Sequence, residues 1–512
     1  MRYLYGLAVF FSIILLGSCR KDFDTVPSSG KLEFSTDTVY LDTIFSGIGS
    51  STYNLKVYNR SDEDISIPSI RLGQGENSHY RLNVDGIPGK TFQNIDILAK
   101  DSIFVFVETT ASITDLTSTG LQFLYTDAIE FDVGVNQQKV ELVTLVQDAV
   151  FLYPERFSDG TTEKLCLGMD EEGNEICIKG FLLEDSELNF TNDKPYVIYG
   201  YAAVPEGKTL NIAAGARVHF HEGSGLIVAN NASLHVNGQK STDPELLENE
   251  VIFEGDRLEP DYSDVPGQWG RIWLTAGSTN HIINHATIKN ATVGIQMDSN
   301  DGGSSPTLTI KNTQIYNSNL VGLYSLTGNI YGENLVINNS GLSSLNLSLG
   351  GTYEFVHCTF ANYWRNGFRQ FPSVLISNQL ETPDEIFVSD LSANFTNCII
   401  YGNENIELIL DKVNEAAFDY HFKNNLIRFR DFNGNFEENP LYDFDNPLIF
   451  EGNVFNENPD FLDSSKNQMN IGEDSAANAL AVPGLVVEDI LGNPRTSEPD
   501  SGAYESIVFP EE

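Results

Sequence analysis

Six side chains between Tyr363 and Phe371 have the types that bind sugars and anions. Two arginines stand there among four aromatic residues, namely Tyr363, Trp364, Arg365, Phe368, Arg369 and Phe371. Sugar rings stack on aromatic faces, and a guanidinium pairs with a carboxylate or a sulfate. The segment therefore predicts a ligand-binding site. The alternative is an insertion whose aromatic side chains pack back onto the protein, and the sequence leaves both interpretations open.

A second group of side chains could hold calcium. Oxygen-bearing side chains alternate with other residues at Asp431, Asn433, Asn435 and Glu437. The segment departs from a calcium-binding loop, because Phe436 stands where glycine is needed and Tyr442 stands where a bidentate glutamate is needed. We therefore expect a turn and no cofactor, and keep Ca²⁺ as the alternative.

The cysteines predict one disulfide and one buried pair of thiols. Cys166 and Cys177 flank a turn-rich tip at residues 168–175, which favours a hairpin closed by a disulfide. Metal binding is disfavoured there because no histidine or further cysteine is near. Cys358 and Cys398 occupy equivalent inward positions of the repeat described below, so we expect buried thiols, with a disulfide as the alternative.

The overall charge limits the partners. The chain has 512 residues, with 30 Lys and Arg against 72 Asp and Glu, for a formal net charge of −42. This length suggests two domains or one elongated repeat. Nucleic acid is excluded as a partner because phosphate binding needs a basic surface. An acidic polysaccharide is disfavoured unless calcium or a local basic patch intervenes.

The N-terminus has the features of an export signal. Arg2 precedes an apolar run that ends near Leu16, and residues 1–18 are too short for a spanning helix of about 20 residues. Leu16-Gly17-Ser18-Cys19 resembles a bacterial lipobox. That resemblance implies removal of the signal peptide, residues 1–18, and lipidation of Cys19, which would anchor the chain in a lipid bilayer.

Residues 19–30 are expected to form a tether. The charged stretch from Cys19 to Asp24 resembles the surface-export signals of some Gram-negative lipoproteins. It implies a location on the outer face of the outer membrane, with a plain solvated tether as the alternative.

Residues 31–150 have the pattern of a β-sandwich. Short alternating segments such as Leu55/Val57 and Val140/Leu142 are separated by turn signals such as residues 85–89. Several short strands at this spacing favour a sandwich. The stretch resembles immunoglobulin-like domains of the ASPM–SPD-2–Hydin type, which mainly space or dock other modules. The hairpin and a linker, residues 151–190, follow.

A repeat begins near residue 190. Its anchor positions are Ile288, Ile315, Ile337, Phe360, Ile400 and Ile427. The positions three residues earlier are His285, Asn312, Asn334, His357, Asn397 and Asn424. Most anchors are 22 to 27 residues apart, and the longer step from Phe360 to Ile400 contains the aromatic insertion. A recurrent apolar anchor with a preceding Asn or His at this period is typical of a solenoid.

The repeat favours a parallel β-helix over a helical solenoid. Each unit has a few alternating strand residues and no amphipathic helical period. In a parallel β-helix each short strand pairs with its equivalent one coil away, about 4.8 Å along the axis. Asparagine adopts the left-handed turn conformation and hydrogen-bonds in stacked ladders. Asn at one offset in successive units is therefore what this fold would use.

Two segments resemble right-handed parallel β-helix surface proteins of bacteria, the pectate-lyase-like solenoids. They are residues 266–273 and the C-terminal residues 489–495 with 499–505. The resemblance implies an all-β chain with a right-handed parallel β-helix over residues 191–480. It also implies a capping segment at 481–512 that covers the last open coil.

The resemblance makes carbohydrate chemistry worth seeking. Polygalacturonase-like hydrolases need a closely spaced Asp pair, and no Asp-Asp dipeptide or Gly-His-Gly occurs in the chain. Lyases need an Arg or Lys base, and no lyase motif surrounds the available arginines, which are Arg271, Arg365, Arg369, Arg428 and Arg430. The catalytic residues are therefore unknown, although a site assembled from different coils would escape such motifs.

These observations predict a surface-anchored lipoprotein that acts as a non-catalytic binding or adhesion scaffold. One long face of the β-helix would contact a glycan or a surface protein through many weak contacts, with residues 363–371 contributing most. The alternative is a carbohydrate-active enzyme, a polysaccharide lyase or glycoside hydrolase, with its site on one face of the coils.

Overall fold

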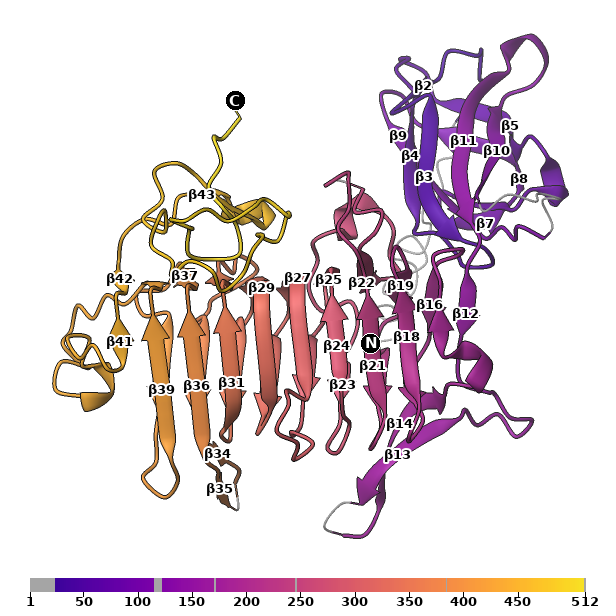
Figure 1. Ribbon diagram of the computed structural model, residues 1–512. Helices are drawn as coiled ribbons and strands as arrows, with labels where there is room; N and C mark the ends of the chain where they lie inside the picture. The colour runs from indigo at the N-terminus through magenta and orange to yellow at the C-terminus, as the bar shows by residue number, and fades with distance from the viewer. Residues whose placement is uncertain (1–23, 115–121, 170–171, 245, 384, 511–512) are drawn as a thin grey trace, which may run out of the picture. The chain divides into compact units, whose positions relative to one another are not determined.

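The computed structural model describes residues 24–114, 122–169, 172–244, 246–383 and 385–510 (Figure 1). The predicted signal peptide and Cys19 lie outside these ranges. The described chain is all-β, and it divides after Asp148 into two compact units. No helix within the described ranges is long and apolar enough to cross a membrane.

The first unit is a β-sandwich of two sheets, as the alternation predicts. One sheet has the order β1 (Val26–Pro27), β5 (Ile65–Leu72), β10 (Gln122–Phe131), β11 (Gln138–Gln147) and β3 (Thr38–Phe45), with β8 (Thr91–Ile97) beside β5. The other has the order β2 (Glu33–Phe34), β4 (Tyr53–Tyr58), β9 (Ser102–Thr109), β6 (Tyr80–Val84) and β7 (Ile87–Gly89). Alternate residues of both sheets, such as Leu55 and Val140, form one buried core.

The second unit is a parallel β-helix whose coils present three faces, which we name A, B and C. Face A contains β14 (Glu175–Leu182), β17 (Tyr201–Val204), β20 (Gly225–Val228), β23 (Ile272–Leu274), β26 (Val293–Met297), β28 (Val321–Leu326), β30 (Leu345–Ser348), β33 (Val374–Ser377) and β38 (Leu408–Asp411). Each of these strands pairs in parallel with the next one in this order.

Faces B and C form one continuous sheet bent at a corner. Face B contains β15 (Asn189–Phe190), β18 (Thr209–Ala213), β21 (Ser233–Asn237), β24 (His281–Asn284), β31 (Gly351–Val356), β36 (Leu391–Thr396), β39 (Phe418–Lys423) and β41 (Phe450–Glu451). Face C contains β12 (Val150–Leu152), β16 (Tyr196–Ile198), β19 (Arg217–Phe220), β22 (Val251–Gly255), β25 (Ala286–Lys289), β32 (Thr359–Asn362), β37 (Ile399–Gly402), β40 (Leu426–Ile427) and β42 (Val454–Phe455). β27 (Leu308–Ser318) and β29 (Asn329–Ser340) run through both faces.

The predicted register is confirmed. On face C, Ile288 pairs with Ile315, and the pairing continues in order through Ile337, Phe360, Ile400 and Ile427. All six anchor side chains are fully buried in the interior of the coils. The 40-residue step is one coil with an insertion, because β32 pairs directly with β37.

The position three residues before each anchor forms the corner between faces B and C. His285, Asn312, Asn334, His357, Asn397 and Asn424 all have φ between 47° and 57°. Asn334 Nδ2 donates to Asn312 Oδ1 at 2.9 Å, and Asn397 Nδ2 donates to His357 Nε2 at 2.8 Å. The left-handed corner explains why Asn and His recur there, because few other side chains tolerate that conformation.

The last coil is closed by residues 429–449, which we call the closing loop. Tyr442 is buried against the core, and Phe436, Phe444 and Ile449 pack around it. Tyr442 also accepts a hydrogen bond from the Leu410 amide of β38 at 2.8 Å. The closing loop, beside β41 in Figure 1, thus covers the open end of the solenoid with aromatic side chains.

The C-terminal residues 457–510, which we call the C-terminal segment, lie elsewhere than expected. They run back over face C and over the corner between faces B and C. Met469, Ile490 and Tyr504 pack on Val336 and Ala361, while Ile471 packs near Ile399. The expected cap at residues 481–512 is therefore a side cover, because the outward side chains of these face C strands are apolar.

The cysteines behave as predicted. Cys166 and Cys177 form a disulfide across the hairpin of β13 (Lys164–Met169) and β14. Cys358 and Cys398 are buried, unbonded and one coil apart, with the Cys358 amide 3.5 Å from Cys398 Sγ.

Candidate functional site

The predicted binding insertion is divided between buried and exposed side chains. Arg369 does not offer its guanidinium to a ligand, because its side chain is only 1% exposed and pairs with Glu407 at 2.6 and 2.8 Å. Trp364 is buried and Tyr363 packs edge-on against Phe461. Arg365 is exposed, as are Phe368 at 84% and Phe371 at 44%. The insertion is thus fixed to the coils by three of its six predicted residues.

The end of the insertion lies beside the second predicted site. Gln370 and Pro372 line a hollow of about 270 Å³ together with side chains of the closing loop, namely Arg430, Asp431, Phe432, Asn433 and Asn435. Phe432 stands at this hollow and is 76% exposed. The structure therefore brings together the insertion and the closing loop, which are about 60 positions apart in the chain.

The segment at Asp431, Asn433, Asn435 and Glu437 has the geometry of a turn. Asp431 Oδ2 accepts the Phe436 amide at 2.7 Å, and Phe436 packs against Phe429 and Tyr442. Within the described ranges, the one cluster of three His, Cys, Asp or Glu side chains with converging ligand atoms contains Cys166 and Cys177, which the disulfide already uses.

A larger cleft of about 670 Å³ lies on face C. Its floor is formed by the outward side chains of β25 and β27, including Thr287, Lys289, Gln314 and Tyr316. One wall is formed by the C-terminal segment, and the other by Lys240, Ser241, Thr242, Pro244 and Leu247. None of the lining side chains was predicted, because they come from separate coils and from the segment that was expected at the end of the solenoid.

Glu250 lines the cleft and Glu254 lies farther along β22, and side chains of the neighbouring coil hold both carboxylates. Glu250 Oε2 accepts from the Thr287 hydroxyl at 3.0 Å, and burial raises the pKa of Glu250 against the effects of Thr287 and Arg217. Burial would also raise the pKa of Glu254, but the charges of His219 and Lys289 outweigh it and lower that pKa. Lys289 Nζ lies 2.8 Å from Glu254 Oε2.

Two tyrosines meet across the cleft. The Tyr504 hydroxyl of the C-terminal segment donates to Gln314 Oε1 at 3.2 Å, and Tyr316 donates to the same oxygen. Burial raises the pKa of each of the two tyrosines well above the usual range of a tyrosine. Both phenols therefore stay protonated at neutral pH and act as hydrogen-bond donors rather than bases.

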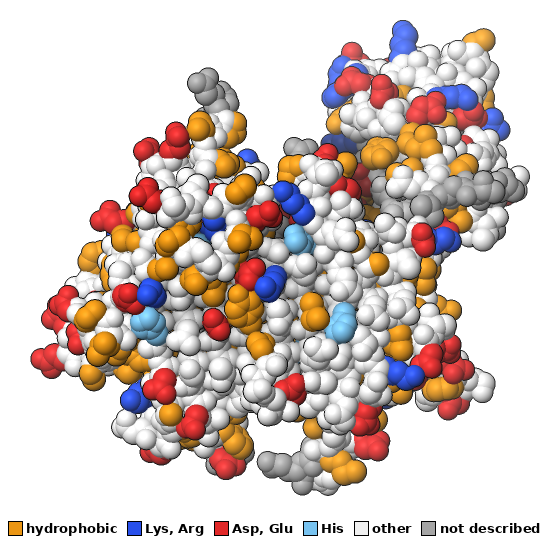
Figure 2. Space-filling model, in the orientation of Figure 1, with side chains coloured by type: hydrophobic (Ala, Val, Ile, Leu, Met, Phe, Trp, Pro, Cys, Tyr) orange, Lys and Arg blue, Asp and Glu red, His pale blue; other side chains and the backbone are white. Residues whose placement is uncertain are grey.

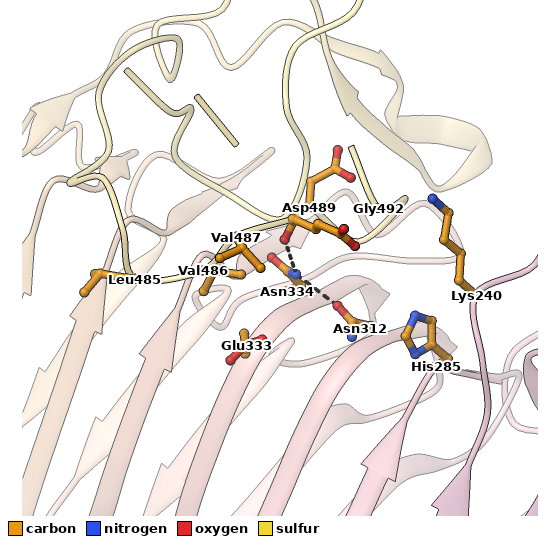
Figure 3. A pocket seen from close by; sticks show the side chains of 11 residues that line it. Lys240, His285, Asn312, Glu333, Asn334, Leu485, Val486, Val487, Asp489 and Gly492 are labelled. Carbon is orange, nitrogen blue, oxygen red and sulfur yellow. Dashed lines mark hydrogen bonds between the residues drawn. The ribbon is translucent and has the colours of Figure 1, made fainter. Parts of the chain in front are cut away.

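The cleft continues into a smaller pocket of about 350 Å³ at the corner between faces B and C (Figure 3). Lys240 and His285 line both hollows. Figure 3 shows them opposite the residues of the C-terminal segment, with Asn334 bonded to Asn312 and to the Glu488 carbonyl. Burial and the charge of Lys240 lower the pKa of His285, and its Nδ1 atom is buried without a hydrogen-bond partner.

No family model and no curated protein matches the chain. Among solved structures, the periplasmic alginate epimerase AlgG is 11% identical, with 56% of this chain and 78% of that chain covered and a TM-score of 0.23. The PapD-like domain 7 of human CEP192 is 14% identical, with coverage of 24% and 89% and a TM-score of 0.16.

A family 123 glycoside hydrolase from Clostridium perfringens is 8% identical, with coverage of 23% of this chain and a TM-score of 0.16. The chain spans about a quarter of that hydrolase, 26% of its length. At these identities and TM-scores the likenesses carry no argument about activity. The description of the fold rests on the strand pairing given above.

One sequence signal could have indicated the cleft. The residues next to the anchors point outward on face C, and they change character along the chain. The residues just before the anchors are Thr287, Gln314, Val336, Thr359, Ile399 and Leu426, so apolar side chains become more frequent along the chain. A solvated strand face keeps polar residues, so the change indicates that later coils are covered and that the cover ends near the polar ones.

Proposed function

We propose that this protein is a surface-anchored lipoprotein that binds glycans without catalysis, and that the cleft on face C is its binding site. The observation that supports the proposal is the lining of this cleft. It is rich in amide and hydroxyl side chains, namely Ser241, Thr242, Thr287, Gln314, Tyr316, Asn317, Asn467, Gln468, Asn470 and Tyr504.

Such a lining suits a ligand with many hydroxyl groups. Amides and hydroxyls both donate and accept hydrogen bonds, as sugar hydroxyls do. Tyrosine adds an apolar ring that packs on the C–H face of a sugar. In a chain with net charge −42, three lysines at the cleft offset the carboxylates of Glu250 and Asp264 and keep its local charge close to neutral.

Binding is favoured over catalysis because the reactive groups are engaged. Lys289 is paired with Glu254, and Glu250 is bonded to Thr287. The two tyrosines share Gln314. A general base needs a free, correctly protonated atom within hydrogen-bond reach of substrate.

The cleft is tested by the double variant Lys240→Ala/Gln468→Ala, which removes exposed side chains from opposite walls. Among the soluble polysaccharides that the wild type retains in affinity electrophoresis, at least one should be bound at least about tenfold more weakly by this variant, since each lost hydrogen bond contributes roughly 1 kcal/mol. The melting temperature should stay near that of the wild type.

Lys412→Ala is the matched control, because this exposed lysine lies away from the cleft. It should bind as the wild type does. Equal affinity of the double variant and the wild type would place glycan binding elsewhere. Failure of the wild type to bind any neutral or acidic polysaccharide in the panel would contradict the proposed function itself.

A glycoside hydrolase is the second candidate, favoured by two carboxylates at the cleft. Glu250 has the raised pKa of a general acid, and Asp264 lines the same cleft. The electrophoresis samples are therefore also assayed for new reducing ends and for the ultraviolet absorbance of unsaturated lyase products. Turnover that Glu250→Gln abolishes would replace the binding proposal with the enzyme.

Anchoring through Cys19 is part of the proposal and has its own test. In a Gram-negative host, the wild type should incorporate labelled palmitate and be removed from intact cells by added protease. Cys19→Ala should lose the label and appear in the soluble fraction. Labelled protein that resists the protease would place the anchor on an inner leaflet.

A further inference from the structure

We infer that face A carries a second binding surface, for a neutral linear glycan chain that lies along the axis of the coils. The surface is a row of outward side chains on four successive coils: Trp273, Gln296, Tyr324 and Asn346. It lies on a different sheet from the cleft and does not depend on the function proposed for that cleft.

The register of face A places these residues in one line. Trp273 of β23 pairs with Gln296 of β26, then Tyr324 of β28 and Asn346 of β30 follow in the same register. Their neighbours along each strand, such as Ile272 and Leu323, are fully buried in the core, so the row points outward. Aromatic and amide side chains alternate at a step of about 4.8 Å.

The first half of the row is held in place by hydrogen bonds. Trp273 Nε1 donates to Asp298 Oδ2 at 2.6 Å, and Gln296 Nε2 donates to Asp298 Oδ1 at 2.8 Å. Arg271 donates to Gln296 Oε1, and its guanidinium lies 5.5 Å from the centre of the Trp273 ring. A surface fixed in this way loses little side-chain entropy when a ligand binds.

The second half of the row keeps free donors. The Tyr324 hydroxyl and Asn346 Nδ2 make no hydrogen bond to any residue that the structure describes, although Asn346 Oδ1 accepts from Ser348. Burial and the charge of Asp298 raise the pKa of Tyr324, so its phenol remains a donor. Both side chains are only partly buried, which leaves them accessible to a ligand.

These features select a neutral glycan as the occupant. The rings of Trp273 and Tyr324 offer stacking surfaces two coils apart, and the Tyr324 hydroxyl and the Asn346 amide match hydroxyl groups. Gln296 between the two rings is buried, and it holds Arg271 and Asp298 in place. A polyanion would be repelled by a chain of net charge −42, and Asp298 lies within the row's own network. A protein partner would instead need a broad apolar centre, whereas this row is one residue wide.

The test uses the soluble chain from residue 20 and three neutral polysaccharides, namely hydroxyethylcellulose, galactomannan and xyloglucan. Affinity electrophoresis should show retention by at least one of them. Tyr324→Ala/Asn346→Ala should weaken that retention about tenfold or more. Titration with oligosaccharides of the retained polymer should show affinity that rises with chain length and then levels off, as a row across several coils requires.

Two control variants test whether the loss of binding is specific to the row on face A. Tyr331→Ala removes a partly exposed tyrosine from face B and should bind normally. The cleft variant Lys240→Ala/Gln468→Ala should keep its length-dependent binding, which separates this surface from the cleft. Retention of polygalacturonate above all three neutral polymers, equal weakening by Tyr331→Ala, or unchanged retention of the Tyr324/Asn346 variant would each overturn the inference.

Discussion

Arg369→Met is expected to lower the free energy of unfolding of the β-helix by about 3–5 kcal/mol, because it leaves the buried Glu407 carboxylate without its partner. Arg369 also donates to the carbonyls of Asn362 and Phe371, so its loss frees the insertion from β32. The measurement is denaturant unfolding followed by tryptophan fluorescence. All three tryptophans, Trp269, Trp273 and Trp364, lie in this unit.

Arg365→Met is the matched control and should change stability by less than about 0.5 kcal/mol, since Arg365 is exposed. The double variant Arg369→Met/Glu407→Leu should recover most of the loss, because replacing both members of a buried pair is often near neutral. A single variant as stable as the wild type would mean that the ion pair does not hold the insertion.

Stability is expected to fall as the pH drops from about 6.5 toward 4, and His357 should account for much of this loss. Burial lowers the pKa of His357 to about 3 and that of His281 to about 4. The unfolded chain binds these protons from about pH 6.5 downward, whereas the folded chain does not. Each histidine should therefore cost about 3 kcal/mol of stability by pH 4.5.

His357→Asn isolates this contribution, because the equivalent corner residues of neighbouring coils are Asn334 and Asn397. Between pH 7 and pH 4.5, the free energy of unfolding of the variant should rise by about 3 kcal/mol relative to that of the wild type. Denaturant unfolding at both pH values measures this difference. His421→Asn, at a partly exposed position on face B, is the control. Parallel pH profiles for wild type and His357→Asn would show that His357 is not buried in its neutral form.

The solenoid was predictable because its corners are chemically demanding. A left-handed corner on every coil restricts the side chain to a few types, so Asn334 and its equivalents mark the period directly in the sequence. The step from Phe360 to Ile400 could also be interpreted as one coil with an insertion. The corner conformation and the length of a coil depend on residues close together in the chain, and both recur from coil to coil.

The site was not predictable for the opposite reason. Tyr504 meets Gln314 across 190 positions, and no period links the C-terminal segment to the coils that it covers. Residue type alone also says nothing about burial: Arg365 and Arg369 look equivalent in the sequence, yet one is solvated and the other is enclosed. Arg369 is enclosed because it pairs with Glu407, which belongs to the next coil of face A.

Face B differs from both proposed surfaces in its exposed residues. Figure 2 shows it in front view, with much of the surface uncharged and with ion pairs such as Lys311–Glu333 and Lys423–Glu451 among its outward side chains. Its outward rows include Thr309, Tyr331 and Asn394. It therefore supplies control positions, such as Tyr331, whose substitution leaves the cleft and the face A row untouched.

The C-terminal segment changes how this solenoid should fold. In a simple repeat protein each coil contacts only its neighbours, so unfolding can spread coil by coil. Here Asn467 bonds to Asn317, Arg495 bonds to Asn334 and Ser501 bonds to the Asn424 carbonyl, so the C-terminal segment joins the middle coils to the last ones. Contacts at such sequence separations slow folding and make it cooperative. The coils can therefore reach their final stability only after the last residues of the chain have packed onto them.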